Sequence, residues 1–425
     1  MNSFDKIIGY ESIKEELLQI CDMMKNKDIY AKLGASLPKG VLLYGAPGLG
    51  KTLMAKCFIE ECGLETFTLR KNKSQNFVEH ISQIFEKAKQ HAPSVVFLDD
   101  MDKFANEDRR HRDAEEYVAV QAGIDSVKGF DVIVLATVND FEKLPDSLTR
   151  AGRFDKCIQI CLPRIDDCRK IIKHYLKGKR VAADVNLDDV AKMINYNSCA
   201  ELETLINEAA VIAGYKRKPH IETEDITDAV LKAEYGAPDD TAAAESDTNL
   251  KRIAYHEAGH LVMSELLCPG CVGLASVRKS KGTTADGFVR QCKRMPTAAD
   301  HILASLAGKA ATELLCGKCD TGCDIDIRQA ADCIRKNIST LGSMGFGLVD
   351  VSNYEFSEHS QRMLSESEAV VHAELSRYMF KAKEILAKNS AFLKKSAELL
   401  LKKGVLLASD IEKLRERFGM ADGDI

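Results

Sequence analysis

The five residues His256-Glu257-Ala258-Gly259-His260 combine two metal-binding side chains and a carboxylate at helical spacing. Side chains four positions apart lie on one face of a helix, so both histidines can bind one Zn²⁺ through imidazole nitrogens. Glu257 stands beside the first ligand, where it can take a proton from an attacking water. The pattern predicts a catalytic zinc site that still needs a third ligand.

Phosphate chemistry is indicated by Gly45-Ala46-Pro47-Gly48-Leu49-Gly50-Lys51-Thr52, which matches a phosphate-binding loop at all its defining positions. The glycines allow backbone N–H groups to turn toward phosphates at the positive end of the following helix. Lys51 is expected to reach the β- and γ-phosphates, and the Thr52 hydroxyl to bind Mg²⁺. A strand before the loop and a helix after it favour an ATP site over a structural glycine turn.

Polar side chains follow two further apolar segments of the first half. Asp99 and Asp100 come after 95–98, and Asn139 comes after 132–137. A carboxylate at a strand end can bind Mg²⁺ through water, which assigns Asp99 to the metal and Asp100 to the attacking water. Asn139 can position the same water or sense the γ-phosphate, an assignment that rests on spacing alone.

Short apolar runs alternate with helical stretches through the first half, a pattern typical of a parallel α/β sheet. Strands are expected at 39–44, 95–98 and 132–137, with helices at 51–62 and 75–91. The rest reads as helical, with helices at 250–267, 298–315 and 325–341, two or three more in 358–418, and a strand or hairpin at 273–290. We therefore expect an α/β domain at 1–165, a small helical lid at 166–235, a linker at 236–249 and a mostly α-helical zinc peptidase domain at 250–425.

Composition narrows the class of protein. The chain has 425 residues, 45% of them hydrophobic, and a net charge of -5, which gives no electrostatic case for nucleic acid as a partner. No apolar run approaches the ~18 residues of a membrane span. The polar start of the chain does not resemble a signal peptide, so we expect a cytoplasmic protein.

Fourteen cysteines in such a compartment should be mostly free thiols. Two C-x-x-C pairs, Cys268 with Cys271 and Cys316 with Cys319, can in principle form a second, structural zinc site. The alternative is two unrelated turns, which the long separation between the pairs favours.

Three further stretches, 39–45, 98–102 and 148–155, make the first half similar to the AAA+ ATPase core. Together with the later zinc motif, they make the chain resemble the FtsH family of ATP-dependent zinc proteases, from about residue 4 to about residue 418. The resemblance implies a homohexamer in which Arg150 and Arg153 reach the neighbouring subunit's γ-phosphate as arginine fingers. Residue types alone leave Asp324 and Asp326 as candidates for the third zinc ligand; the family pattern selects Asp326.

The chain departs from that family at three places. Asp99-Asp100 replaces the family's Asp-Glu pair, and the shorter Asp100 predicts slow but real hydrolysis because a ~1 Å misplacement can cost about a hundredfold in rate. The substrate loop of the central pore is altered, with Phe77 as the best candidate to grip substrate and a core position as its alternative. The two transmembrane helices ahead of the family's ATPase domain are not found in this sequence.

The function expected from these features is an ATP-dependent zinc metalloendopeptidase that unfolds, translocates and degrades unfolded or tagged proteins in a soluble ring. It would need Zn²⁺, ATP and Mg²⁺. The alternative is an AAA+ unfoldase or remodeller with weak or absent proteolysis, which the Asp100 and pore departures favour.

Overall fold

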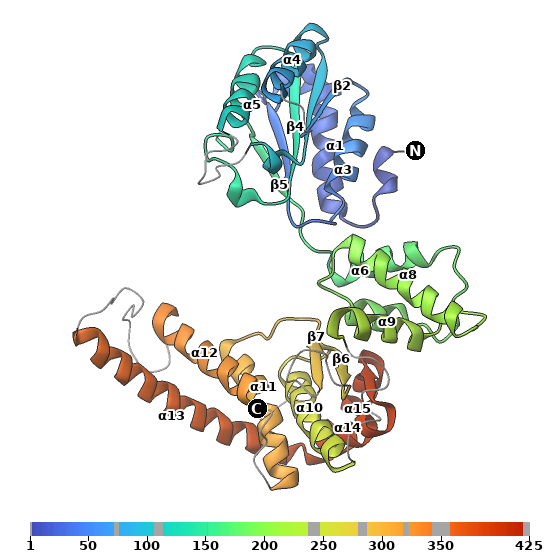
Figure 1. The fold of residues 1–425 in the computed structure, drawn as a ribbon, viewed down its shortest axis with the longest axis vertical. Coiled ribbons are helices and arrows are strands. Elements are labelled where there is room, and N and C mark those ends of the chain that lie inside the picture. The colour runs from blue at the N-terminus through green and yellow to red at the C-terminus, as the bar shows by residue number, and fades with distance from the viewer. Residues whose placement is uncertain are drawn as a thin grey trace. The chain divides into compact units, whose positions relative to one another are not determined.

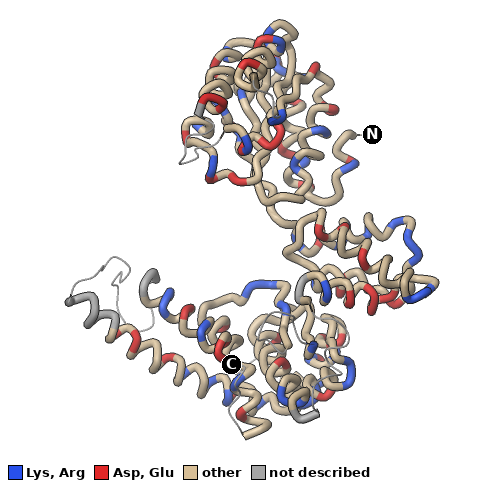
Figure 2. Tube along the Cα trace, viewed as in Figure 1, with Lys and Arg blue, Asp and Glu red and all other residues tan. Residues whose placement is uncertain are grey.

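The computed structural model describes residues 2–71, 76–105, 114–150, 152–236, 247–278, 287–317, 323–341 and 358–419. They belong to two compact units, one comprising 1–177 and 196–204, the other 178–195 and 205–425 (Figure 1). Within these ranges, no helix is both long and apolar enough to cross a membrane. Lys and Arg are interspersed with Asp and Glu along both units (Figure 2).

The first unit is built on a five-stranded parallel sheet with the strand order β2-β3-β4-β1-β5. Strands β3 and β4 are buried at every position, as expected of central strands covered on both faces. The carboxyl ends of parallel strands meet at one edge, which brings the segments after β1, β3 and β4 together. The strands are β1 (Gly40–Tyr44), β2 (Glu65–Arg70), β3 (Ser94–Asp99), β4 (Val132–Val138) and β5 (Lys156–Gln159).

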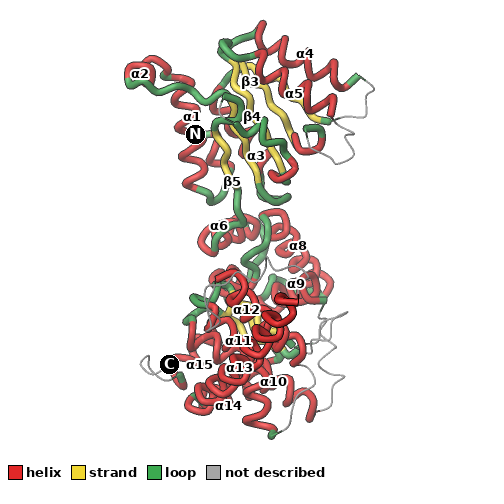
Figure 3. The backbone as a smooth tube through the Cα atoms, turned by 90° about the vertical axis from the view of Figure 1, so that its left-hand side faces the viewer, coloured by secondary structure: helices red, strands yellow, loops and turns green. Residues whose placement is uncertain are grey.

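Helices cover both faces of this sheet, α4 and α5 on one face and α1 and α3 on the other (Figures 1 and 3). Phe77, the first residue of α4, is only 4% exposed, and its ring lies 5.4 Å from that of Phe104. It is therefore a core residue, and its role as a substrate-gripping residue is not supported. The helical segments are η1 (Ser3–Lys6), α1 (Glu11–Lys25), α2 (Lys27–Lys32), α3 (Lys51–Cys62), α4 (Phe77–Gln90), η2 (Met101–Lys103), α5 (Ala114–Ser126), η3 (Phe141–Lys143) and α6 (Ile165–Leu176).

The second unit is mostly helical and contains a three-stranded antiparallel sheet with the order β7-β6-β8. Its central helices α10 and α11 cross closely at Gly259, where a Cβ would lie 2.4 Å from the Ala307 carbonyl oxygen. The elements are α10 (Asp247–Leu267), β6 (Val272–Ser276), β7 (Phe288–Gln291), α11 (Ala298–Cys316), α12 (Asp324–Leu341), α13 (Glu358–Lys388), α14 (Ser390–Lys403), β8 (Val405–Leu407) and α15 (Ala408–Phe418).

The stretch 166–235 is helical as expected, but its helices divide between the two units. Helix α6 lies in the first, α7 (Leu187–Met193) and α9 (Thr223–Tyr235) lie in the second, and α8 (Cys199–Tyr215) runs through both. In the second unit, the Asp189 carboxylate of α7 accepts hydrogen bonds from the backbone N–H and hydroxyl of Ser409, at 2.8 and 2.6 Å. Helix α7 thereby caps the start of α15.

Candidate functional site

The glycine loop connects β1 to α3, as the sequence predicted. Gly50 precedes α3 with φ +85°, a conformation that favours glycine. Lys51 is 6% exposed and its Nζ donates to the Gly45 and Ala46 carbonyl oxygens, both at 2.7 Å. Burial lowers the pKa of Lys51. The loop thus folds around its own lysine, and the following N–H groups of α3 can receive phosphate.

The Mg²⁺-binding groups predicted from the sequence lie together. The Asp99 carboxylate is 6% exposed, and its Oδ1 accepts hydrogen bonds from the hydroxyls of Thr52, at 3.0 Å, and Thr137, at 2.9 Å. Thr52 and Asp99 are therefore in direct contact although 47 residues separate them. This pair fits Mg²⁺, which prefers oxygen ligands and a small number of carboxylates.

Asp100 has several cationic and polar neighbours. Its Oδ2 lies 2.6 Å from Lys103 Nζ and 3.3 Å from Arg70 Nη2. Its Oδ1 accepts a hydrogen bond from Asn139 Nδ2 at 3.3 Å, so Asn139 lies beside the carboxylate assigned to the attacking water. Burial alone would raise the pKa of Asp100, but the hydrogen bonds and charges around it lower the pKa below its usual value.

The two expected arginine fingers have different environments. Arg153 is held inside the unit, with Nε 3.1 Å from Asp125 Oδ1 and Nη2 2.7 Å from Asp125 Oδ2. This bidentate pair lowers the pKa of Asp125 to about 2 through the hydrogen bonds from Arg153. Arg150 is exposed. In this arrangement Arg150 is the better candidate to contact a neighbouring molecule.

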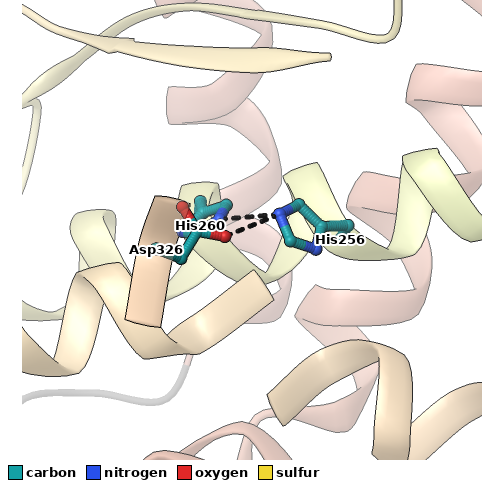
Figure 4. A group of neighbouring side chains, drawn as sticks. All are labelled: His256, His260 and Asp326. Atoms are coloured by element: carbon teal, nitrogen blue, oxygen red, sulfur yellow. Dashed lines mark hydrogen bonds and ion pairs between the residues drawn. The ribbon is translucent and has the colours of Figure 1, made fainter. Parts of the chain in front are cut away.

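The zinc motif lies in the middle of α10 and meets Asp326 in the first turn of α12 (Figure 4). Asp326 Oδ2 is 3.1 Å from His256 Nε2 and 3.3 Å from His260 Nε2. The two Nε2 atoms are 3.1 Å apart. Across the described ranges, these three residues form the one group of three or more ligand-type side chains that converges in this way.

The donor set and its spacing fit Zn²⁺. Around a tetrahedral zinc with ligands at about 2.1 Å, neighbouring ligand atoms stand about 3.4 Å apart, close to the separations seen here. Two imidazoles and one carboxylate leave a fourth position open, which distinguishes catalytic from structural zinc sites. Asp324 is more exposed and pairs with Arg328 at 4.0 Å, so the structure brings Asp326 and not Asp324 to the histidines.

The surroundings shift the pKa values of the two histidines in opposite directions. Burial lowers the pKa of His256. Burial opposes the charged form of His260 too, but its hydrogen bond and charge interaction with Asp326 raise the pKa to about 9. The Nδ1 atom of His260 lies 2.7 Å from the Ala304 carbonyl oxygen. That contact from α11 fixes the imidazole so that Nε2 faces the metal position.

Glu257 is 5% exposed and lines the same cavity of about 420 Å³ as His256, His260 and Asp326. Gly287 makes room for it, because a Cβ there would lie 2.7 Å from Glu257 Cγ. Strand β7 contributes Phe288, Val289 and Gln291 to the lining. A base, a metal position and a strand thus surround one cavity.

Two supporting positions on α11 did not emerge from the sequence. One is Ala304, which acts through its backbone. The other is Gly308, where a Cβ would lie 2.4 Å from His260 Nε2 and 2.6 Å from His256 Cε1. Both contacts depend on the crossing of two helices far apart in the chain, for which the local sequence carries no signal.

A second zinc site is not assembled among the described cysteines. Cys268 and Cys271 share a turn closed by a 3.1 Å backbone hydrogen bond, and burial raises the pKa of the Cys271 thiol. Cys316 is exposed at the end of α11, and Cys319 lies outside the described residues. The cysteines that the structure describes are free thiols.

Comparison with known proteins finds a family match in each half of the chain. Residues 41–162 match the ATPase family associated with various cellular activities (AAA), and residues 243–414 match peptidase family M41. The chain is 33% identical over 374 residues to the ATP-dependent zinc metalloprotease FtsH of Leptotrichia buccalis, covering 82% of this chain and 48% of that protein. It is 31% identical to FtsH 3 of Symbiobacterium thermophilum, covering 80% and 57%, and 30% identical to FtsH of Mycoplasma pneumoniae, covering 97% and 62%. The chain therefore spans about half to three fifths of the length of these relatives.

Proposed function

Because this FtsH-like chain joins an AAA ATPase domain to a peptidase family M41 domain, we propose that it is an ATP-dependent zinc metalloendopeptidase. The observation that carries the proposal is the convergence of His256, His260 and Asp326 beside the buried Glu257. The phosphate-binding loop in the same chain supports the ATP-dependent part of the proposal.

The peptidase residues have distinct tasks. His256, His260 and Asp326 would hold Zn²⁺, which when bound polarises a peptide carbonyl and makes water a better nucleophile. Glu257 takes a proton from the attacking water and passes it to the leaving amine. Its burial beside the metal position keeps the carboxylate within the cavity, close to where the peptide bond must lie.

A substrate segment can bind along β7. This strand pairs with β6 on one side, is the edge strand of the sheet that the structure describes, and lines the zinc cavity. An extended peptide can add to such an edge through backbone hydrogen bonds, which depend little on side-chain identity. An unfolded polypeptide of varied sequence is the substrate class that suits this mode.

The nucleotide half would bind ATP with Lys51 on the phosphates and Thr52 and Asp99 on Mg²⁺. Exposed Arg150 is the proposed contact to a neighbouring copy, and a homohexamer is the proposed assembly. ATP-driven motion in such a ring would move unfolded or tagged proteins to the zinc cavities. The expected cytoplasmic location remains a prediction from the sequence.

The test is degradation of a loosely folded protein such as casein by the full chain, with and without ATP. We expect fragments only when ATP and zinc are both present. Glu257→Gln should bind zinc normally, hydrolyse ATP normally and produce no fragments, because it lacks the base. Zinc content measured by mass spectrometry and phosphate release provide the controls.

Other outcomes would change the proposal. ATP-independent cleavage that still needs Glu257 would show a zinc peptidase whose activity is not coupled to ATP hydrolysis. ATP hydrolysis without fragments from any substrate would favour the remodeller. Fragments that persist in Glu257→Gln would contradict the assigned base.

A further inference from the structure

Arg70, at the end of β2, contacts the carboxylates of Asp99 and Asp100 at the carboxyl end of β3. Its Nη2 lies 3.3 Å from Asp100 Oδ2, and its Nε lies 3.7 Å from Asp99 Oδ2. The β2–β3 register places Arg70 directly opposite Asp99, so the contact follows from strand pairing. The Arg70 side chain is 66% exposed, and packing does not fix it in this position.

Arg70 also lies close to the phosphate loop. The Asp99 carboxylate accepts the Thr52 hydroxyl on Oδ1 and faces Arg70 with Oδ2. A single carboxylate therefore separates the guanidinium from the hydroxyl assigned to Mg²⁺. The terminal phosphate of a nucleoside triphosphate, which shares Mg²⁺ with Thr52, must come within reach of a side chain as long as arginine.

Binding of Mg²⁺ and a triphosphate would change the partners that Arg70 prefers. Mg²⁺ takes up the negative charge of Asp99, while the terminal phosphate offers oxygens at the spacing of the guanidinium fork. Lys103 remains three residues from Asp100, at 2.6 Å, and can stay with it. Exchange of Arg70 from carboxylate to phosphate thus satisfies all the charges without opening the fold.

We propose that Arg70 is a sensor of the terminal phosphate within the same subunit. It bridges Asp99 and Asp100 in the arrangement described here, and moves to the γ-phosphate when a nucleoside triphosphate binds, which removes one of the two cations that contact Asp100 Oδ2. ADP has no such phosphate and leaves the bridge in place. The inference rests on the proposed ATPase function and adds a residue that discriminates ATP from ADP.

The experiment compares binding of ADP and of a non-hydrolysable ATP analogue, each carrying a fluorescent label, to the full chain. In Arg70→Ala we expect affinity for the triphosphate to fall about tenfold or more, because a hydrogen bond to a charged group is lost. Affinity for ADP should change less than twofold. Arg70→Lys keeps the charge without the fork and should fall between wild type and Arg70→Ala.

Two further variants separate this role from general electrostatics. Lys103→Ala removes the other cation from Asp100 and should leave the ratio of the two affinities unchanged. Lys156→Ala removes a cation that pairs with Glu16 at 2.7 Å and serves as the matched surface control. Melting temperatures check that each variant is folded.

Each remaining outcome decides the question. Equal weakening of both nucleotides in Arg70→Ala, or no change in either, would overturn the sensor. A rise in ATP turnover with an unchanged affinity ratio would also overturn it, and would make Arg70 a restraint on Asp100 alone. Wild-type protein that binds neither nucleotide would instead refute the proposed ATPase function.

Discussion

At the scale of single residues, Gly308 shows how one missing methyl group permits a metal site. Helix α11 passes so close to the zinc ligands that a Cβ at this position would overlap both imidazoles. The neighbouring turn of the same helix supplies the Ala304 carbonyl that orients His260. One helix therefore both approaches the metal position and holds a ligand in the required orientation.

Gly308→Ala should weaken zinc binding while the protein still folds. The added methyl must displace His256 or His260, at a cost in folding stability of about 1–3 kcal/mol typical of overpacking. Zinc content after dialysis and the melting temperature measure the two effects. Gly214→Ala is the control, since nothing lies within 4 Å of its Cβ and alanine favours helix, so it should not lower stability. Full zinc occupancy in Gly308→Ala would show that the ligands can rearrange.

The sequence predicted those site residues that lie close together in the chain at a spacing typical of a known motif. His256 and His260, and Lys51 and Thr52, are near neighbours in the chain, so a helix or a loop places them without knowledge of the fold. Arg70 was not recognised, because its contacts depend on which strand lies beside β3. Arg153 was recognised but its local partner, Asp125, was not. Long-range pairs of this kind carry no periodic signal.

At the scale of elements, buried strands and amphipathic helices were predicted well, and the edge strands of the parallel sheet were missed. Expected strands at 39–44, 95–98 and 132–137 correspond to β1, β3 and β4, and the expected helix 51–62 is α3. Strand β2 was missed because it is largely exposed and reads Glu-Thr-Phe-Thr-Leu-Arg, with polar residues at every other position. Continuous apolar runs mark only strands that are covered on both faces.

The contact between α7 and α15 gives an element-scale prediction. Asp189 is 5% exposed and accepts two hydrogen bonds from Ser409 at the start of α15. Asp189→Ala should lower the free energy of unfolding by about 1–3 kcal/mol, because a buried backbone N–H loses its charged acceptor. Asp189→Asn keeps one oxygen and should lose less. Urea unfolding followed by circular dichroism measures both, and equal stability of all three proteins would contradict the capping role.

At the scale of the whole molecule, the second unit contains residues that precede 237–246 in the chain as well as residues that follow it. The Asn195 side chain, just beyond α7, donates to the Cys292 carbonyl oxygen at 2.8 Å, and Asp228 of α9 pairs with Arg278 at 3.0 Å. Gly273 of β6 approaches the Lys192 backbone so closely that a Cβ would lie 2.2 Å from its carbonyl oxygen. The peptidase core therefore packs against chain that precedes its own sequence match at 243–414.

This packing determines where the chain can be divided for expression. A fragment of residues 178–425 should unfold cooperatively, whereas 250–425 should melt several degrees lower or aggregate, since each kcal/mol lost corresponds to about 2–4 °C. Differential scanning calorimetry of the two fragments would check this, and equal melting temperatures would show that α7 and α9 are dispensable. A chain that begins at residue 250 would lose the hydrogen bonds and the ion pair that join these upstream residues to Cys292, Arg278 and Ser409.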